Sequence, residues 1–149
     1  MDRGEMEGLL ERALVGHLGL CVDGEPYVVP IGFVYHNGCI YFHSYPRGRK
    51  VEAMRRNSRV CFQVEEVGRF LPGEAPCKFG VEYRSVIAYG RVRFLEEAEE
   101  KLEALRLLLR KYGGSEAAEA LSEEMLGGVL VGEIRVEEMT GRRRLKALK

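Results

Sequence analysis

The sequence predicts one mainly β domain in which six antiparallel strands form a small barrel and helices fill the crossovers. Short segments of alternating or continuous apolar character follow one another early in the chain. The pairs Asp23-Gly24 and Asn37-Gly38 are strong hairpin signals. Closure of the sheet would remove its exposed edges. A length of 149 residues suits one hydrophobic core, so we expect a single domain over 1–149.

The expected strands cover residues 17–22, 26–35, 39–44, 59–66, 81–95 and 128–139. Gly90 falls inside the fifth of these and indicates a bend or bulge. Residues 67–80 contain three glycines and two prolines, a composition typical of a loop.

The expected helices cover residues 5–15, 48–57, 96–112 and 115–125. The first and third have apolar residues at helical spacing. Gly16 is expected to end the first helix, Gly113-Gly114 the third, and Ser115 could cap the fourth. The tail, 141–149, is basic and expected to be exposed.

Composition argues against several classes of function. Lys plus Arg equals Asp plus Glu at 23 each, so the basic footprint of a nucleic-acid binder is missing. No apolar run approaches the roughly 20 residues of a membrane helix, and the acidic N-terminus does not resemble a secretory signal, so we expect a cytoplasmic protein. The four cysteines match no zinc spacing, and we expect no metal.

The densest chemical signal lies in residues 41–50. An expected strand ends at Ser44, a loop with proline and glycine follows, and Arg47, Arg49 and Lys50 crowd the start of a helix. Cations are unusual at this positive end of a helix. A bound phosphate would relieve that conflict, with the Ser44 hydroxyl as a further donor. The alternative is a solvated basic turn.

His43 precedes this loop directly. An imidazole exchanges a proton near neutral pH, so His43 is a candidate cofactor contact or proton donor. Histidines are more often packing residues, which is our interpretation of His17 and His36.

Two further segments interrupt their strands. A polar run from Glu82 to Ser85 is either the exposed start of a strand or a surface that faces a ligand. Pro30 cannot donate to a ladder and Gly32 has no side chain, which indicates a strand edge or a bulge that another molecule approaches. A simple edge strand explains the second segment equally well.

Other chemistries lack their motifs. The chain has no GxGxxG sequence after a strand, no Walker loop and no GxSxG elbow.

Four motifs in order, PYVVPI, YFHS, GRK and YRSV, resemble the 5-nitroimidazole-resistance branch of the pyridoxamine-phosphate-oxidase-like family. The resemblance covers roughly residues 9–141. It implies a split β-barrel that forms a homodimer with two FMN molecules in the interface. The chain does not show the aromatic-rich C-terminal motif of true pyridoxamine-phosphate oxidases, so oxidation of pyridoxine phosphate is not expected.

The resemblance also implies roles for individual residues. Ser44, Arg49 and Lys50 would hold the phosphate, with Gly48 in the same loop and His43 nearby. The flavin ring would be lined by Val29, Pro30, Ile31 and Gly32, partly through backbone groups, and Arg84 and Ser85 would contact the cofactor from the fifth strand.

These roles lead to an FMN-dependent oxidoreductase that reduces a small molecule, with His43 as the proton donor. The redox chemistry would belong to the flavin. Two alternatives stay open: a flavin-binding or redox-sensing module without a substrate of its own, and a binder of haem or deazaflavin.

Overall fold

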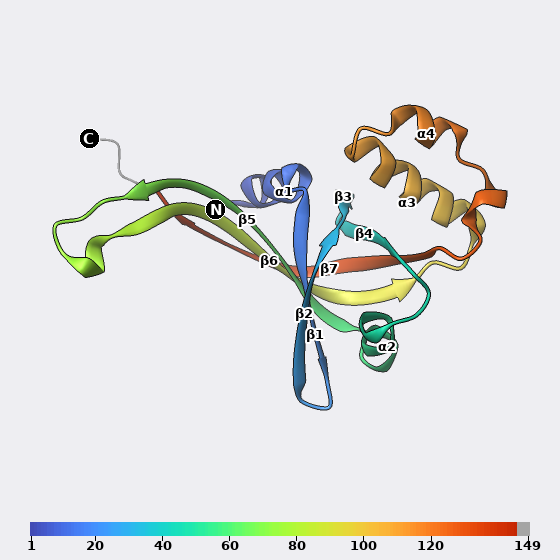
Figure 1. Ribbon diagram of the computed structural model, residues 1–149, viewed down its shortest axis with the longest axis horizontal. Helices are drawn as coiled ribbons and strands as arrows, with labels where there is room; N and C mark the ends of the chain where they lie inside the picture. Colours follow the sequence, from blue (N-terminus) through green and yellow to red (C-terminus); the bar gives the residue numbers. More distant parts are fainter. Residues whose placement is uncertain (146–149) are drawn as a thin grey trace.

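One antiparallel sheet of seven strands organises the molecule, and helices cover its ends (Figure 1). The computed structural model describes residues 1–145. The strand order is β2-β1-β5-β6-β7-β4-β3. The strands are β1 Val15–Val22, β2 Glu25–Gly32, β3 Val34–His36, β4 Cys39–Ser44, β5 Arg59–Leu71, β6 Gly80–Phe94 and β7 Leu130–Arg144. The helices are α1 Arg3–Arg12, α2 Arg49–Arg56, α3 Ala98–Lys111 and α4 Ser115–Ala120, with 3₁₀ turns η1 Pro76–Lys78 and η2 Glu123–Leu126.

Both hairpin predictions are confirmed. Asp23 and Gly24 have φ of 53° and 79°, and Asn37 and Gly38 have φ of 47° and 78°. Two consecutive positive φ values are the signature of the tight turn that matches the twist of a hairpin, and Asn, Asp and Gly tolerate them best. These turns join β1 to β2 and β3 to β4.

The predicted second strand is two strands, and the predicted closed barrel is open. The chain leaves the β2 pairing after Gly32, passes through Phe33, and continues as β3. β2 and β3 lie at opposite ends of the sheet order. The ends of the sheet are therefore connected through the backbone at Phe33 and not through a ladder of hydrogen bonds. This break at Phe33 accounts both for the seventh strand and for the opening of the barrel. The predicted split-barrel class is confirmed.

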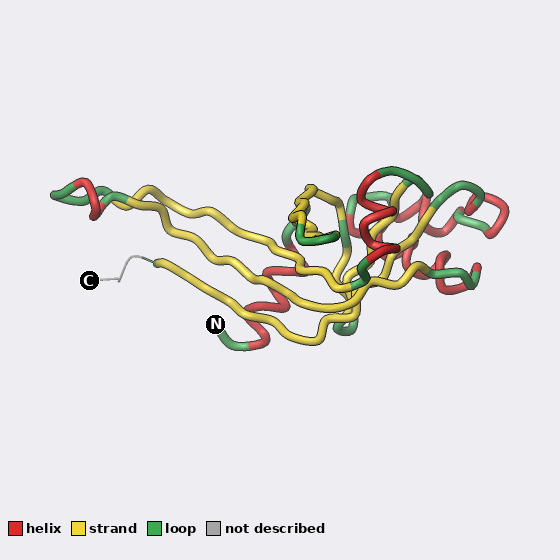
Figure 2. Tube along the Cα trace, turned by 90° about the horizontal axis from the view of Figure 1, so that it is seen from below, coloured by secondary structure: helices red, strands yellow, loops and turns green. Residues whose placement is uncertain are grey.

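The loop predicted over 67–80 is confirmed for residues 72–79, which include the turn η1, but its two ends are strand. β5 continues to Leu71 and β6 begins at Gly80, with an irregular register between Val67 and Phe70. The expected exposed tail is also strand as far as Arg144, because β7 pairs with β6 up to Tyr83. Residues 146–149 lie outside the described part of the chain. The result is a long ribbon that projects past α1 (Figures 1 and 2). We call its end, residues 67–83, the arm.

The core fills the concave side of the sheet. Phe33 and Phe62 pack edge to face with their ring centroids 4.7 Å apart. Glycine makes room for such rings, since a Cβ on Gly16 would lie 2.0 Å from the Phe62 ring. A Cβ on Gly90 would lie 2.0 Å from the Arg135 carbonyl oxygen, and the β6–β7 register shifts at this position, which confirms the predicted bulge.

The helices begin or end a few residues away from their expected bounds. α1 starts earlier than predicted because Asp2 and Glu5 form a capping box, and it ends at Arg12, before Gly16. Gly16 is instead part of β1. The predicted fourth helix consists of α4 and the turn η2, and Ser115 is the first helical residue after the Gly114 N-cap.

Candidate functional site

The corner between β4 and α2 holds the residues expected to bind phosphate. β4 ends at Ser44 and α2 begins at Arg49. Between them Gly48 has φ +118°, a conformation that favours glycine. Gly48 is also the N-cap and has no side chain to cap the helix. The first N–H groups of α2 are thus available to an acceptor from outside the helix. The helix is anchored by Val51, Ala53 and Met54, which are buried.

A pocket of about 400 Å³ lies at this corner. It is lined by His43, Ser44, Tyr45, Lys50, Gly128 and Val129. Ser44 is only 9% exposed, whereas His43 is exposed. The structure thus brings together three residues expected at the site. The sequence analysis missed Tyr45 and the stretch 128–129, because Ser44 pairs with Leu130 across β4 and β7 and no local motif indicates that pairing.

Arg49 lies on the other flank of α2. Its guanidinium carbon is 4.1 Å from the centroid of the Tyr27 ring, within the range of a cation–π contact. Arg49 and Tyr27 line a second pocket of about 310 Å³, together with Asp23, Glu25, Glu52 and Arg56. The two neighbouring cations therefore diverge. Lys50 shares a pocket with Ser44, whereas Arg49 packs against β2.

β2 carries the four residues expected to line the flavin ring. It pairs with β1 on one side and is the terminal strand of the sheet on the other, so the predicted edge strand is confirmed. Val29 is half-buried and Ile31 is buried, while Pro30 and Gly32 are exposed.

The free edge of β2 lies beside β4, although the two strands are not hydrogen-bonded. β3 pairs with β4 from Cys39 to Tyr41 only, so Phe42, His43 and Ser44 have no β3 partner. We call the gap between β2 and the 42–44 end of β4 the split. It is bordered by strand edges whose backbone groups are not used in a ladder.

Arg84 and Ser85 lie on the ribbon, away from the corner (Figure 1). The Arg84 guanidinium is 3.5 Å from Glu66, and the same carboxylate accepts a hydrogen bond from Arg12 of α1 at 2.6 Å. Arg84 thus faces α1. Ser85 pairs with Glu65 and points to the opposite side, as alternation along a strand requires. A single chain does not bring these two residues together with Ser44 and Lys50.

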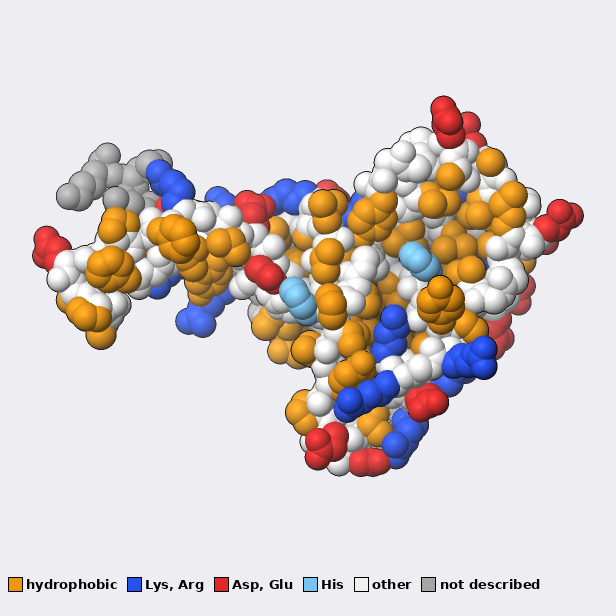
Figure 3. Space-filling view, in the orientation of Figure 1, with side chains coloured by type: hydrophobic (Ala, Val, Ile, Leu, Met, Phe, Trp, Pro, Cys, Tyr) orange, Lys and Arg blue, Asp and Glu red, His pale blue; other side chains and the backbone are white. Residues whose placement is uncertain are grey.

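The convex side of β1, β2, β5 and β6 forms a surface that we call the outer face. Its cross-strand rows are Val28, Gly19, Cys61 and Tyr89, then Pro30, His17, Gln63 and Ile87. The polar pair Glu65 and Ser85 comes next, and the face continues along the arm through Val67 opposite Tyr83 and Phe70 opposite Val81. It is mostly apolar, and Figure 3 shows hydrophobic side chains gathered on the arm.

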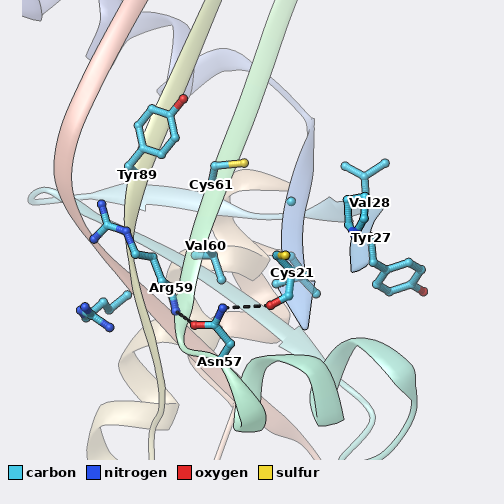
Figure 4. A pocket seen from close by; sticks show the side chains of 12 residues that line it. Cys21, Tyr27, Val28, Asn57, Arg59, Val60, Cys61 and Tyr89 are labelled. Atoms are coloured by element: carbon cyan, nitrogen blue, oxygen red, sulfur yellow. Dashed lines mark hydrogen bonds between the residues drawn. The ribbon is translucent and has the colours of Figure 1, made fainter. Parts of the chain in front are cut away.

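A shallow pocket of about 690 Å³ opens on the outer face (Figure 4). Cys61 and Tyr89 form its floor beside Gly19, where a Cβ would lie 2.5 Å from the Cys61 sulfur. Asn57 closes one end by donating to the Cys21 carbonyl oxygen at 2.9 Å and accepting from the Arg59 backbone at 3.1 Å. The sequence analysis did not predict this pocket, because four strands contribute to it.

An ion pair between the buried Glu133 and the exposed Arg93 lies beneath α3. Glu133 accepts from Arg93 at 2.8 Å, and Arg93 also contacts Glu100 at 3.2 Å. Burial and the nearby Glu133 charge raise the pKa of Tyr41 and of Cys39, so both side chains stay protonated at neutral pH. We assign this cluster to structure, since every charge in it has a partner.

Within residues 1–145, no group of three or more His, Cys, Asp or Glu side chains is arranged to hold a metal ion. The helices in this part of the chain are too short or too polar to cross a bilayer.

Comparisons with known proteins identify the family and the fold. A family model described as pyridoxamine 5'-phosphate oxidase matches residues 2–143. A candidate 5-nitroimidazole antibiotic resistance protein from Bacteroides thetaiotaomicron is 30% identical, with 94% of this chain and 82% of that one covered and a TM-score of 0.78. A FAD-binding protein from Mesorhizobium loti is 28% identical, with 97% and 96% covered and a TM-score of 0.75.

Two further proteins match at lower identity. A flavocytochrome from Azotobacter vinelandii superposes with a TM-score of 0.85 at 22% identity, covering 97% of this chain and 68% of that one. An uncharacterized protein of Rhizobium meliloti strain 1021 is 27% identical over 150 residues, which cover 95% of this chain and 92% of the relative. The chain belongs to the pyridoxamine 5'-phosphate oxidase family and has the flavin-binding split-barrel fold.

Proposed function

We propose that this protein binds FMN in the split, with the phosphate at the corner of β4 and α2, and that it reduces a small molecule as a flavin-dependent oxidoreductase. The observation that carries the proposal is the pocket that combines Ser44, Lys50 and the uncapped end of α2 beside the free edge of β2.

The corner fits a phosphate group. A hydroxyl, an ammonium group and free helix N–H groups are all donors, and each is strengthened by an anionic acceptor. Lys50 is half-buried and Ser44 nearly buried, so their contacts would be partly shielded from water. The nearby Arg49 adds positive charge and a long side chain that can leave the Tyr27 ring.

The β2 edge fits a flat heterocycle. Flavin presents a polar rim of donors and acceptors and two apolar faces. Free backbone groups along 29–32 would meet the rim, while the Val29 and Ile31 side chains pack toward the core and keep the strand in place. Pro30 is exposed and its side chain is small, so a ring can approach the strand closely at this position.

FMN supplies hydride or electron transfer when bound, and the residues of the chain provide the rest. His43 lies in the same pocket as Lys50 and is exposed, so its imidazole is able to deliver a proton to a substrate at the mouth of the split. Tyr45 and Val129 border the same pocket.

We also propose that two copies pair through the outer face. Val28 is 64% exposed and Phe70 is 89% exposed, values that are unusual for large apolar side chains on one continuous surface. From Tyr89 to Val81 the surface is about 26 Å long and two to four strands wide, or about 400 Å² in projection. A stable pair buries roughly 800 Å² per partner, so the outer face is of the right order for a symmetric dimer.

Such a dimer would give Ser85 a role. Ser85 shares the outer face with Ile87 and Tyr83, and a second copy packed there would bring the ribbon of one chain toward the split of the other. Each flavin would then lie between two subunits, as the family resemblance implies.

The decisive experiment is to purify the protein, record its absorbance, and identify the released cofactor by mass. We expect a yellow protein whose cofactor is FMN, bound with micromolar or tighter affinity, and NAD(P)H-driven reduction of a quinone or nitro compound. His43→Asn should keep FMN and lose at least tenfold in turnover. A colourless protein that does not bind added FMN would contradict the proposal.

The same spectrum separates the alternatives. A Soret band would indicate haem, and a blue-shifted flavin-like spectrum would indicate a deazaflavin. Bound flavin without turnover of any electron acceptor would favour a binding or redox-sensing module. The expected cytoplasmic location stays a prediction.

A further inference from the structure

The end of α3 is fastened to the backbone at the point where β2 becomes β3. The Tyr112 hydroxyl accepts a hydrogen bond from the Phe33 N–H at 2.7 Å. It lies 2.7 Å from the Leu14 carbonyl oxygen and 3.1 Å from the Phe33 carbonyl oxygen. A phenol has one proton, so it donates to one carbonyl at a time, and Leu14 is the nearer acceptor.

The contacts of the Tyr112 hydroxyl take the place of strand-to-strand hydrogen bonds at Phe33. Phe33 lies between β2 and β3 and is in neither strand, so its N–H has no strand partner. Leu14 directly precedes β1, whose first residue Val15 pairs with Gly32. Tyr112 therefore ties the last pair of the β1–β2 hairpin to α3. A Cβ on Gly32 would lie 3.0 Å from the hydroxyl, so only a residue without bulk fits here comfortably.

Lys111 adds a parallel contact. Its ammonium group donates to the Ala13 carbonyl oxygen at 2.5 Å and lies 3.8 Å from the centroid of the Phe33 ring. The two consecutive side chains thus hold three backbone positions, at Ala13, Leu14 and Phe33, from one helix end. The hairpin end cannot move without breaking these contacts.

We propose that Tyr112 is a positioning residue that fixes Ile31 and Gly32 and thereby sets the affinity and the reduction potential of the bound flavin. The second part rests on the proposed function, because those two residues are expected to line the ring. Tyr112 acts through the β2 backbone, which it holds at Phe33. Loss of its hydroxyl releases one end of the strand that the flavin rim contacts.

The first test needs no flavin. Tyr112→Phe should speed amide hydrogen exchange at residues 31–34 by at least about tenfold, since Phe33 loses its acceptor. Tyr35→Phe is the matched control. Its hydroxyl donates to Glu7 at 3.0 Å and ties β3 to α1, so it removes a similar bond without touching β2. Unchanged exchange at 31–34 in Tyr112→Phe would overturn the tether.

The second test measures FMN dissociation and midpoint potential in the same variants. We expect Tyr112→Phe to bind FMN about tenfold more weakly, with a shifted potential, and Tyr35→Phe to stay within about twofold. If Tyr112→Phe melts at a lower temperature but keeps the wild-type affinity and potential, its role is structural only and the proposal fails. If the wild type binds no FMN, the proposed function fails, and the exchange result still decides the tether.

Discussion

Two polar interruptions of apolar strands, the corner at 43–50 and the ribbon at 82–85, have different outcomes in the fold. In the corner the chain turns, so consecutive residues converge and His43, Ser44 and Lys50 line one pocket. In the ribbon the chain stays extended, so Arg84 faces α1 and Ser85 faces the outer side. A run of polar residues makes a site where a turn gathers it, whereas a strand sends alternate members to opposite faces.

The corner should carry most of the cofactor affinity. Replacing both Arg49 and Lys50 by Ala removes two charged phosphate contacts, each worth about 1.5–3 kcal/mol, so FMN should bind roughly 100-fold more weakly or worse. Lys50→Ala alone should have a larger effect than Arg49→Ala, because Lys50 shares the pocket with Ser44 and Arg49 packs on Tyr27. Fluorescence titration with FMN measures both.

Arg55→Ala is the control for general loss of charge. It lies on the same helix, and its guanidinium is 5.0 Å from the Phe94 ring centroid, outside the pocket. If this variant weakens FMN as much as Lys50→Ala, the effect is long-range electrostatics and the corner is not the phosphate site.

The ribbon should carry most of the dimer affinity. Phe70→Glu places a charge on the most exposed apolar side chain of the arm. Burying that charge in an interface and losing an aromatic contact should weaken dimerisation by at least about 30-fold. Sedimentation velocity over a concentration series measures the shift. Met125 is also a large exposed apolar residue, but it lies in η2 and not on the arm. Met125→Glu should therefore leave the dimer intact.

The two ribbon residues should differ from each other. Ser85→Ala should weaken FMN binding about three- to tenfold, the value of one hydrogen bond, and only in the dimer. Arg84→Ala should cost at most about 1 kcal/mol of unfolding free energy through its contact with Glu66, because both side chains are partly exposed. Equal effects of the two variants on FMN would mean that the ribbon does not alternate at the site as described.

The smallest expected effect is the pH dependence of stability that comes from Lys111. Burial lowers its pKa from 10.5 to about 8. Between these values the unfolded chain keeps a proton that the folded chain has released, so stability rises with pH across this window and falls as pH drops through 8. Relative to Lys111→Met, the unfolding free energy of the wild type should rise by about 1 kcal/mol from pH 7 to about pH 10, since half exposure reduces the linkage. If the difference in unfolding free energy between the wild type and Lys111→Met does not change with pH, the burial of Lys111 is contradicted.

Local chemistry made much of this molecule predictable. The two hairpin turns follow from Asp-Gly and Asn-Gly pairs, and α1 and α3 from their apolar spacing. The corner was predictable because its residues are contiguous. Pro30 and Gly32 indicated an edge strand, and β2 is one.

The remainder depends on long-range pairing. The break at Phe33 was not predicted, because the hydroxyl that satisfies the Phe33 N–H there belongs to Tyr112, 79 residues away. Residues 67–71, at the start of the predicted loop, are strand because β5 pairs with β6 there. Gly128 and Val129 reach the corner only through the β4–β7 register.

The affinity of FMN relative to riboflavin tests most directly whether a phosphate binds at the corner of β4 and α2. The two ligands differ only in the phosphate. Titrated in parallel, FMN should bind the wild type at least about 100-fold more tightly, and Lys50→Ala should reduce this ratio by at least about tenfold. Equal affinity for both ligands in the wild type, or a ratio unchanged by Lys50→Ala, would contradict the account.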